Sequence, residues 1–178
     1  ITTYKSPVSK IFHSDASHRH NMVSIIAAST TNNFIADDVE IRKKDVSYTY
    51  KTIQNLKNTL KNEDICVIIG LDVFLHIETW YNYEKIIEEV NIIVVNRPDF
   101  NIKSTENMGF SILSKITKDK TRFLESKKGC IFFYEMPSIG ISSTRIRNMI
   151  GRGENPSGMI PGSIMSYIKR NKLYMEKI

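Results

Sequence analysis

The sequence has 178 residues, of which 41% are hydrophobic and 25% are charged, and its formal net charge is +6 at pH 7. This length suits one domain with a substantial core, and the composition excludes an intrinsically disordered chain. The longest apolar runs, such as residues 66–69, are far shorter than the ~20 residues that cross a bilayer. The positive charge favours an anionic partner, either a nucleic acid or a phosphorylated small molecule.

Short β-branched runs alternate with helical patterns, which predicts a mainly parallel sheet covered by helices. Strands buried on both faces are predicted at 65–69 and 92–95, a third at 131–134, and the end of another at 1–4. Apolar residues at helical spacing predict helices between the strands. These helices lie around residues 22–26, 53–60 and 84–89, after Ser142, and from Pro161. Residues 99–129 are polar and weakly periodic, and they predict a variable surface segment with one helix.

Cys66 and Cys130 lie in apolar or aromatic stretches and lack the close spacing of a zinc or redox pair. They predict two buried structural thiols, in keeping with a reducing cytoplasm. The lysines are scattered among asparagines rather than gathered with aromatic residues into a stripe, so they predict solvated helix faces. No basic-then-apolar leader opens the chain. We expect a cytoplasmic protein without nucleic-acid or membrane partners, and an oligomer is compatible with the sequence.

The stretch with the most chemical content is residues 141–147, Ile-Ser-Ser-Thr-Arg-Ile-Arg. Hydroxyl residues just before a helix cap its free N–H groups, and the same helix terminus attracts phosphate. An arginine one turn into the helix adds a planar, charged fork for phosphoryl oxygens. The stretch therefore predicts an anion site, although a capped helix with two solvated arginines has the same pattern.

Two other stretches carry polar and aromatic residues at the predicted ends of elements. Residues 47–52, Ser-Tyr-Thr-Tyr-Lys-Thr, open a predicted helix, where Ser47 and Thr49 would be caps. Residues 68–72 end a strand and bring Asp72 to the carboxyl edge of the sheet, where α/β folds bind ligands. A carboxylate there accepts hydrogen bonds from ribose hydroxyls. Trp80 follows eight residues later, as a core or rim aromatic.

Together these stretches resemble motifs of the nicotinate (or nicotinamide) mononucleotide adenylyltransferases, a family of the nucleotidyltransferase superfamily. Residues 141–147 resemble ISSTxIR, residues 47–52 resemble SYTxDT with a lysine at the acidic position, and Gly70 to Asp72 resemble GxD, with Trp80 at the family's spacing. Supporting marks are HRxxM at 18–22, the RP pair at 97–98, and the closing VP…YI…LY pattern at 160–174. The motifs follow the family's order over residues 1–178.

The resemblance implies a doubly wound (Rossmann-like) α/β fold with a mainly parallel sheet and a small helical C-terminal part. It implies transfer of the adenylyl group of ATP to the mononucleotide, with release of pyrophosphate, in NAD biosynthesis, and Mg²⁺ accompanies ATP. Ser142, Ser143 and Arg147 would bind ATP, and Arg147 would also be catalytic. The residues that would bind the pyridine mononucleotide are Lys10, Tyr48, Thr49, Gly70, Asp72, Trp80, Tyr81 and Arg97.

The sequence departs from the family's pattern in two places. Ser9 replaces a histidine of the PPHK motif and leaves Lys10. The GxFxPxHxGH motif does not occur, and none of His13, His18, His20 and His76 has its spacing. In the family this motif lies just before the segment that Ile1 begins. We therefore expect residues 1–178 to be a single nucleotidyltransferase domain that lacks a preceding strand and helix.

Three other interpretations stay open. The first is an adenylyltransferase of the phosphopantetheine type, which would not need the set of Thr49, Asp72 and Trp80. The second takes the missing histidine motif literally and makes the chain a non-catalytic nucleotide-binding remnant. The third is a nucleic-acid binder, which rests on charge alone and would show affinity that falls steeply with salt.

Overall fold

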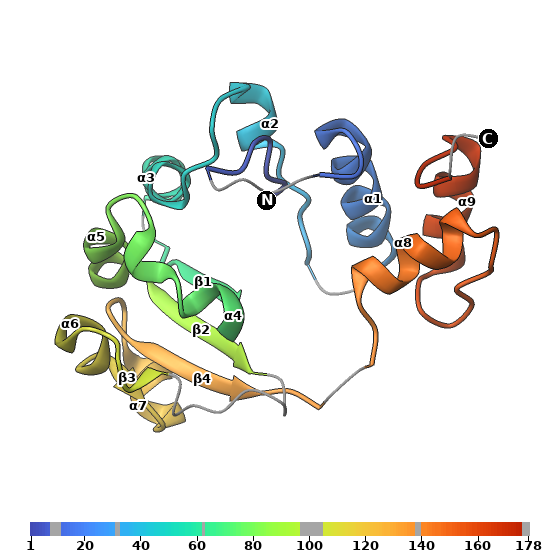
Figure 1. Ribbon diagram of the computed structural model, residues 1–178. Coiled ribbons are helices and arrows are strands. Elements are labelled where there is room, and N and C mark those ends of the chain that lie inside the picture. The colour runs from blue at the N-terminus through green and yellow to red at the C-terminus, as the bar shows by residue number, and fades with distance from the viewer. Residues whose placement is uncertain (8–11, 31–32, 62, 97–104, 138–139, 176–178) are drawn as a thin grey trace. The chain divides into compact units, whose positions relative to one another are not determined.

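The computed structural model describes residues 1–7, 12–30, 33–61, 63–96, 105–137 and 140–175 (Figure 1). The chain forms two compact units, one made of Ile1–Ser47 and Ile139–Ile178 and the other of Tyr48–Ser138. Each unit has its own hydrophobic core. The predicted single, N-terminally incomplete domain stays a prediction.

The first unit is helical. It contains α1 (Ala16–Ser29), α2 (Val39–Lys43), α8 (Ser143–Gly151) and α9 (Gly162–Arg170). Ile150, Ile164 and Ile168 are buried, and apolar side chains of α1, among them Met22 and Ile25, pack against them. The small helical C-terminal part that the sequence predicts is therefore present, and it shares a core with α1. Residues 1–4 form no strand; the nearest pairing is an isolated parallel bridge between Lys5 and Val46, so the predicted strand end is wrong.

Arg19 of α1 ties the first residues of the chain to this unit. Its guanidinium donates hydrogen bonds to the carbonyl oxygens of Thr3 (2.7 Å), Tyr4 (3.2 Å) and Ser14 (3.3 Å), and it lies 3.9 Å from the ring centroid of Phe12. Burial lowers the pKa of Arg19, yet an arginine in a protein keeps its charge. The arginine of the HRxxM motif therefore fixes backbone in this structure.

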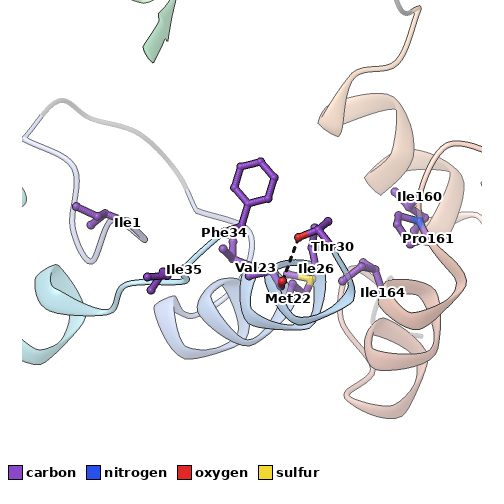
Figure 2. Close-up of a pocket in the computed structure, with 11 residues that line it drawn as sticks. Ile1, Met22, Val23, Ile26, Thr30, Phe34, Ile35, Ile160, Pro161 and Ile164 are labelled. Atoms are coloured by element: carbon purple, nitrogen blue, oxygen red, sulfur yellow. Dashed lines mark hydrogen bonds between the residues drawn. The ribbon is translucent and has the colours of Figure 1, made fainter. Parts of the chain in front are cut away.

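An apolar hollow of about 570 Å³ lies beside α1 in the same unit (Figure 2). Val23 and Ile26 of α1, Phe34, Ile35 and Ile164 are among the side chains that line it, and Phe34 is 64% exposed. No described helix, here or in the second unit, is long and apolar enough to cross a bilayer.

The second unit is built on a parallel four-stranded sheet with the strand order β1-β2-β4-β3. The strands are β1 (Cys66–Gly70), β2 (Asn91–Asn96), β3 (Ile116–Thr117) and β4 (Ile131–Glu135). The helices are α3 (Thr49–Thr59), α4 (Leu71–Phe74), the 3-10 helix η1 (Ile77–Thr79), α5 (Tyr83–Glu89), α6 (Phe110–Leu113) and α7 (Lys120–Glu125). The predicted α/β class with a parallel sheet is confirmed, as are the three main strands.

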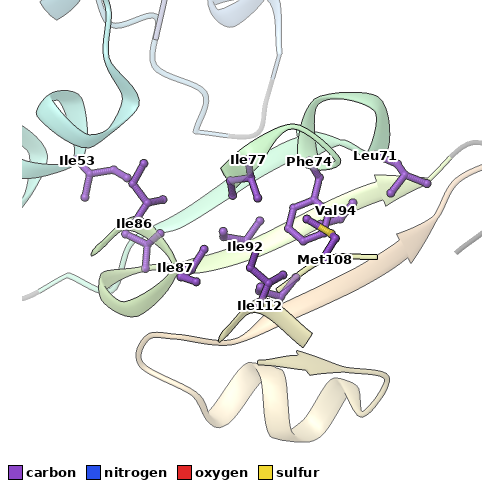
Figure 3. Packing of buried hydrophobic residues seen from close by; sticks show 12 residues of the cluster. Ile53, Leu71, Phe74, Ile77, Ile86, Ile87, Ile92, Val94, Met108 and Ile112 are labelled. Carbon is purple, nitrogen blue, oxygen red and sulfur yellow. The ribbon is translucent and has the colours of Figure 1, made fainter. Parts of the chain in front are cut away.

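One face of this sheet carries the core of the unit (Figure 3). Ile92 and Val94 of β2 alternate onto that face and are at most 1% exposed. Ile53 of α3, Ile86 of α5 and Phe74 of α4 pack in the same cluster. Each such side chain contributes about 1.5–3 kcal/mol when fully buried, so this face holds the unit together.

The other face of β1 is open, which contradicts the prediction of a strand buried on both faces. Ile68 is 67% exposed, and Cys66 is exposed as well. Successive side chains of a strand point to opposite faces, and the helices of the core cluster cover only the face of Val67 and Ile69. The prediction of two buried thiols therefore holds for Cys130, which is 4% exposed, and is wrong for Cys66.

Residues 99–129 are more structured than the sequence predicts. Their described part contains α6, β3 and α7, and it buries Met108, Ile112 and Phe123. The side chain of Asp119 caps α7 by accepting hydrogen bonds from two backbone N–H groups, at 2.8 and 3.2 Å. These elements have two to six residues each, too few for a period to stand out from the polar residues around them.

Candidate functional site

In the first unit, Ser142 begins α8 as the sequence predicts. It is the N-cap residue, and its Oγ accepts a hydrogen bond from the backbone N–H of Arg145 at 3.2 Å. Ser143 is the first helical residue, and both serines are exposed. An open helix N-terminus with hydroxyl groups beside it is suited to an anion.

Arg147 lies one turn further along α8, at a cavity of about 510 Å³. Its Nη2 donates a hydrogen bond to Thr144 Oγ1 at 3.2 Å, and the residue is half-buried. Arg145 is exposed, its side chain donates to the carbonyl oxygen of Gly140 at 3.3 Å, and it does not line the cavity. Of the two arginines in this stretch, Arg147 is therefore the one that lines this cavity.

In the second unit, Gly70 and Asp72 lie where β1 ends. Gly70 closes the strand opposite Val95 of β2, and Asp72 follows in the first turn of α4 with its side chain exposed. A Cβ atom on residue 70 would come within 2.5 Å of Asp72 Oδ1. The glycine therefore makes room for a carboxylate that folds back over the carboxyl end of the strand, the edge at which parallel sheets bind ligands.

An aromatic cluster lies at the start of α3. The ring of Tyr81 lies 5.1 Å from that of Tyr48 and 6.1 Å from that of Tyr50, centroid to centroid. Trp80 is half-buried and packs against the sheet core, whereas Tyr81 is 50% exposed. The structure thus brings together Tyr48 and Tyr81, two of the predicted mononucleotide-binding residues. Tyr50, which was not predicted, belongs to the same aromatic cluster.

Ser47 and Thr49 do not cap α3, so that interpretation is wrong. The N-cap residue is Tyr48, which makes no side-chain cap hydrogen bond. Ser47 Oγ accepts instead from the backbone N–H of Tyr4 at 3.1 Å, and Thr49 is the first residue of the helix. Lys10 and Arg97, the other two predicted mononucleotide contacts, lie outside the described residues.

Two of the four histidines make structural side-chain contacts. His18 Nδ1 lies 2.9 Å from the hydroxyl of Tyr167, and His20 Nδ1 lies 3.3 Å from Thr2 Oγ1. His13 lines the cavity of Arg147, a position that the sequence analysis missed because no motif or period marks it. Within the described ranges, no three His, Cys, Asp or Glu side chains are grouped as metal ligands.

A family model described as cytidylyltransferase-like matches residues 5–149. The probable nicotinate-nucleotide adenylyltransferase of Clostridium tetani is 31% identical over 160 residues, which are 90% of this chain and 74% of that protein. This chain belongs to the nicotinate-nucleotide adenylyltransferase family. The probable nicotinate-nucleotide adenylyltransferase of Methylococcus capsulatus is 28% identical over 160 residues, 90% of this chain and 76% of the relative.

Solved structures of the family share the fold. The Plasmodium falciparum nicotinic acid mononucleotide adenylyltransferase complexed with NaAD has a TM-score of 0.67 at 20% sequence identity, over 96% of this chain and 78% of that chain. The same enzyme complexed with APC has a TM-score of 0.63 at 20% identity, over 90% and 76%. These likenesses confirm the Rossmann-like nucleotidyltransferase fold.

Proposed function

We propose that this protein transfers the adenylyl group of ATP to nicotinate mononucleotide, giving the dinucleotide and pyrophosphate in NAD biosynthesis. The observation that carries the proposal is the pairing, on one helix, of a serine-capped N-terminus with an arginine that lines a cavity. Family membership supplies the reaction. Nicotinamide mononucleotide is the second acceptor of the same chemistry.

In this reaction the 5′-phosphate of the mononucleotide attacks the α-phosphate of ATP in line. The bond from that phosphorus to the bridging oxygen breaks, and pyrophosphate leaves with the electron pair. No protein nucleophile is needed, so the protein acts by positioning and by neutralising charge. In our proposal, Ser142, Ser143 and the N–H groups of α8 bind phosphoryl oxygens, and Arg147 neutralises the charge that develops on the leaving group. Mg²⁺ bound to ATP would neutralise part of the charge on its phosphates.

Residues of the second unit are proposed to bind the acceptor. Asp72 is suited to accept hydrogen bonds from ribose hydroxyls, because its carboxylate is exposed at the carboxyl edge of the sheet. Thr49 would donate its hydroxyl hydrogen to the nicotinate carboxylate, with Tyr48 and Gly70 beside the same ligand. Trp80 and Tyr81 offer aromatic surface for the pyridine ring. Arg97 of this unit and Lys10 of the first unit complete the proposed set.

The proposed reaction takes place in the cytoplasm, and its ligands are ATP and the mononucleotide rather than a nucleic acid or a membrane. Release of pyrophosphate from ATP by the native protein tests it, with nicotinate mononucleotide, nicotinamide mononucleotide and phosphopantetheine offered separately. We expect turnover with a pyridine mononucleotide and none with phosphopantetheine. Turnover with phosphopantetheine alone would move the protein to the other branch of the superfamily. Binding of ATP without pyrophosphate release from any acceptor would make it a non-catalytic remnant.

A further inference from the structure

The cavity of Arg147 runs along one side of α8 rather than ending at its N-terminus. The residues that α8 and its C-cap contribute recur at intervals of three and four, which places them on one helix face. His13 and Tyr174 close the cavity from two other segments of the unit. Its lining is Thr144, Arg147, Asn148, Gly151 and Arg152 from the helix, with His13, Tyr174 and Met175 opposite.

The charge of this lining is that of an extended anion site. Arg147 and Arg152 both face the cavity, and the described lining includes no carboxylate. Five residues of α-helix rise by ~7.5 Å, so the two guanidinium groups can contact different phosphoryl groups of one chain. The hydroxyl of Thr144, the amide of Asn148 and the imidazole of His13 add further hydrogen-bonding groups to the lining.

Arg152 forms an ion pair with Glu154, and its guanidinium is still able to bind an anion. Its Nε lies 2.9 Å from Glu154 Oε1 and its Nη2 lies 3.5 Å from Glu154 Oε2. Both side chains are well exposed, at 62% and 48%, and exposed ion pairs of this kind are weak. The contact uses one edge of the guanidinium, so Nη1 keeps two N–H donors for a ligand.

Gly151 contributes to the same space. It lies one turn after Arg147 on the cavity face of α8, and it has no side chain to project there. A leucine at this position would enter the cavity from the helix side. Because leucine has a much higher helix propensity than glycine, the substitution should not weaken α8 itself.

We infer that this cavity binds a diphosphoryl group, with Arg152 and His13 as binding residues beyond the family's motif. The group is the β- and γ-phosphates of ATP before transfer and the pyrophosphate product after it. The inference rests on the proposed function, since it names where that reaction holds its leaving group. Arg147, at the end of the cavity nearer to Ser142, contacts the phosphoryl group closer to the reacting phosphorus, and Arg152 contacts the distal one.

Calorimetric titration of the native protein and its Arg152→Ala variant with pyrophosphate, ATP and AMP tests the inference. AMP lacks the two distal phosphates. We expect Arg152→Ala to weaken pyrophosphate and ATP binding about 10- to 30-fold, because one charge-assisted contact is lost, and to leave AMP binding unchanged. His13→Ala should act in the same direction with a smaller effect.

The matched control is Arg145→Ala, which removes the same charge from the same helix but lies outside the cavity. An equal loss of pyrophosphate affinity in Arg145→Ala and Arg152→Ala would reduce the effect to net charge and overturn the inference. Unchanged pyrophosphate affinity in Arg152→Ala would overturn it as well.

A steric pair gives a second measurement that does not depend on charge. Gly151→Leu should abolish pyrophosphate binding, while Gly151→Ala should keep most of it, with far-UV circular dichroism showing that both fold. Normal binding in a folded Gly151→Leu variant would refute the cavity as the site. These titrations need no turnover. If pyrophosphate binds in an Arg152-dependent way but no adenylyl group is transferred, the inference stands and the proposed function fails. If transfer proceeds and Arg152→Ala changes neither binding nor the KM for ATP, the inference fails alone.

Discussion

Replacing Arg147 with alanine removes the guanidinium that lines the α8 cavity. In the fold this side chain makes one hydrogen bond, to Thr144 Oγ1, and no ion pair with a described carboxylate. The cost in stability should therefore be below ~1 kcal/mol, the usual net value of a single hydrogen bond. A charge-assisted contact to a phosphoryl oxygen is stronger, about 2 kcal/mol, which corresponds to roughly 30-fold in kcat/KM for ATP.

Steady-state measurement of pyrophosphate release, with a thermal melt beside it, separates these two effects. We expect Arg147→Ala to keep its Tm within a few degrees of the native protein and to lose kcat/KM for ATP. Arg147→Lys should recover only part of that loss, because an ammonium group cannot make the bidentate contact of a guanidinium. Full activity in Arg147→Ala together with a large loss in Arg145→Ala would refute the assignment of the two arginines.

Trp80→Ala should weaken mononucleotide binding by about 1 kcal/mol beyond the loss of buried area while ATP binding changes little; equal losses for both ligands in a titration would mean that Trp80 only supports the core against which it packs. Gly70→Ala should raise the KM for the mononucleotide, because the new Cβ must displace the Asp72 carboxylate; an unchanged KM would count against a role for that carboxylate. The pKa of Glu89 is lowered, mainly by the hydrogen bond from Lys57 and less by that from Gln54. The ionised Glu89 therefore stabilises the fold at every pH above ~4.3, the ordinary pKa of glutamate. This contribution disappears as the pH falls through the lowered pKa, so denaturant unfolding of Glu89→Gln should show a smaller loss of stability between pH 7 and pH 3 than the native protein shows.

The parts of the fold that the sequence predicts well are those with a strong local signal. The run from Ile92 to Val95 is long and β-branched, and β2 follows it. Ser142 precedes a helical pattern and is the N-cap that α8 needs. Motif spacing singles out Gly70 and Asp72, which lie where β1 ends, and Arg147, which lies one turn into α8. Their roles in binding stay predictions.

The remaining features depend on tertiary structure. Whether Cys66 and Ile68 are covered depends on which face of the sheet the helices pack against, and the strand pattern is the same in both cases. The contact of Tyr50 with Tyr81 joins residues 31 positions apart, and His13 meets α8 across most of the chain. Neither contact leaves a periodic pattern in the local sequence. The predicted roles of Lys10 and Arg97 stay predictions.

In the hydrogen bonds of Arg19, the donor depends on its side chain but the acceptors do not. All three acceptors, at Thr3, Tyr4 and Ser14, are backbone carbonyl oxygens, which every amino acid carries. Those three positions can therefore change residue type without loss of these bonds. Arg19 has no such freedom, because a lysine has a single nitrogen that cannot reach three carbonyl groups in different directions. A saturation-mutagenesis scan of this segment should accordingly find Arg19 less tolerant of substitution than Thr3 and Tyr4.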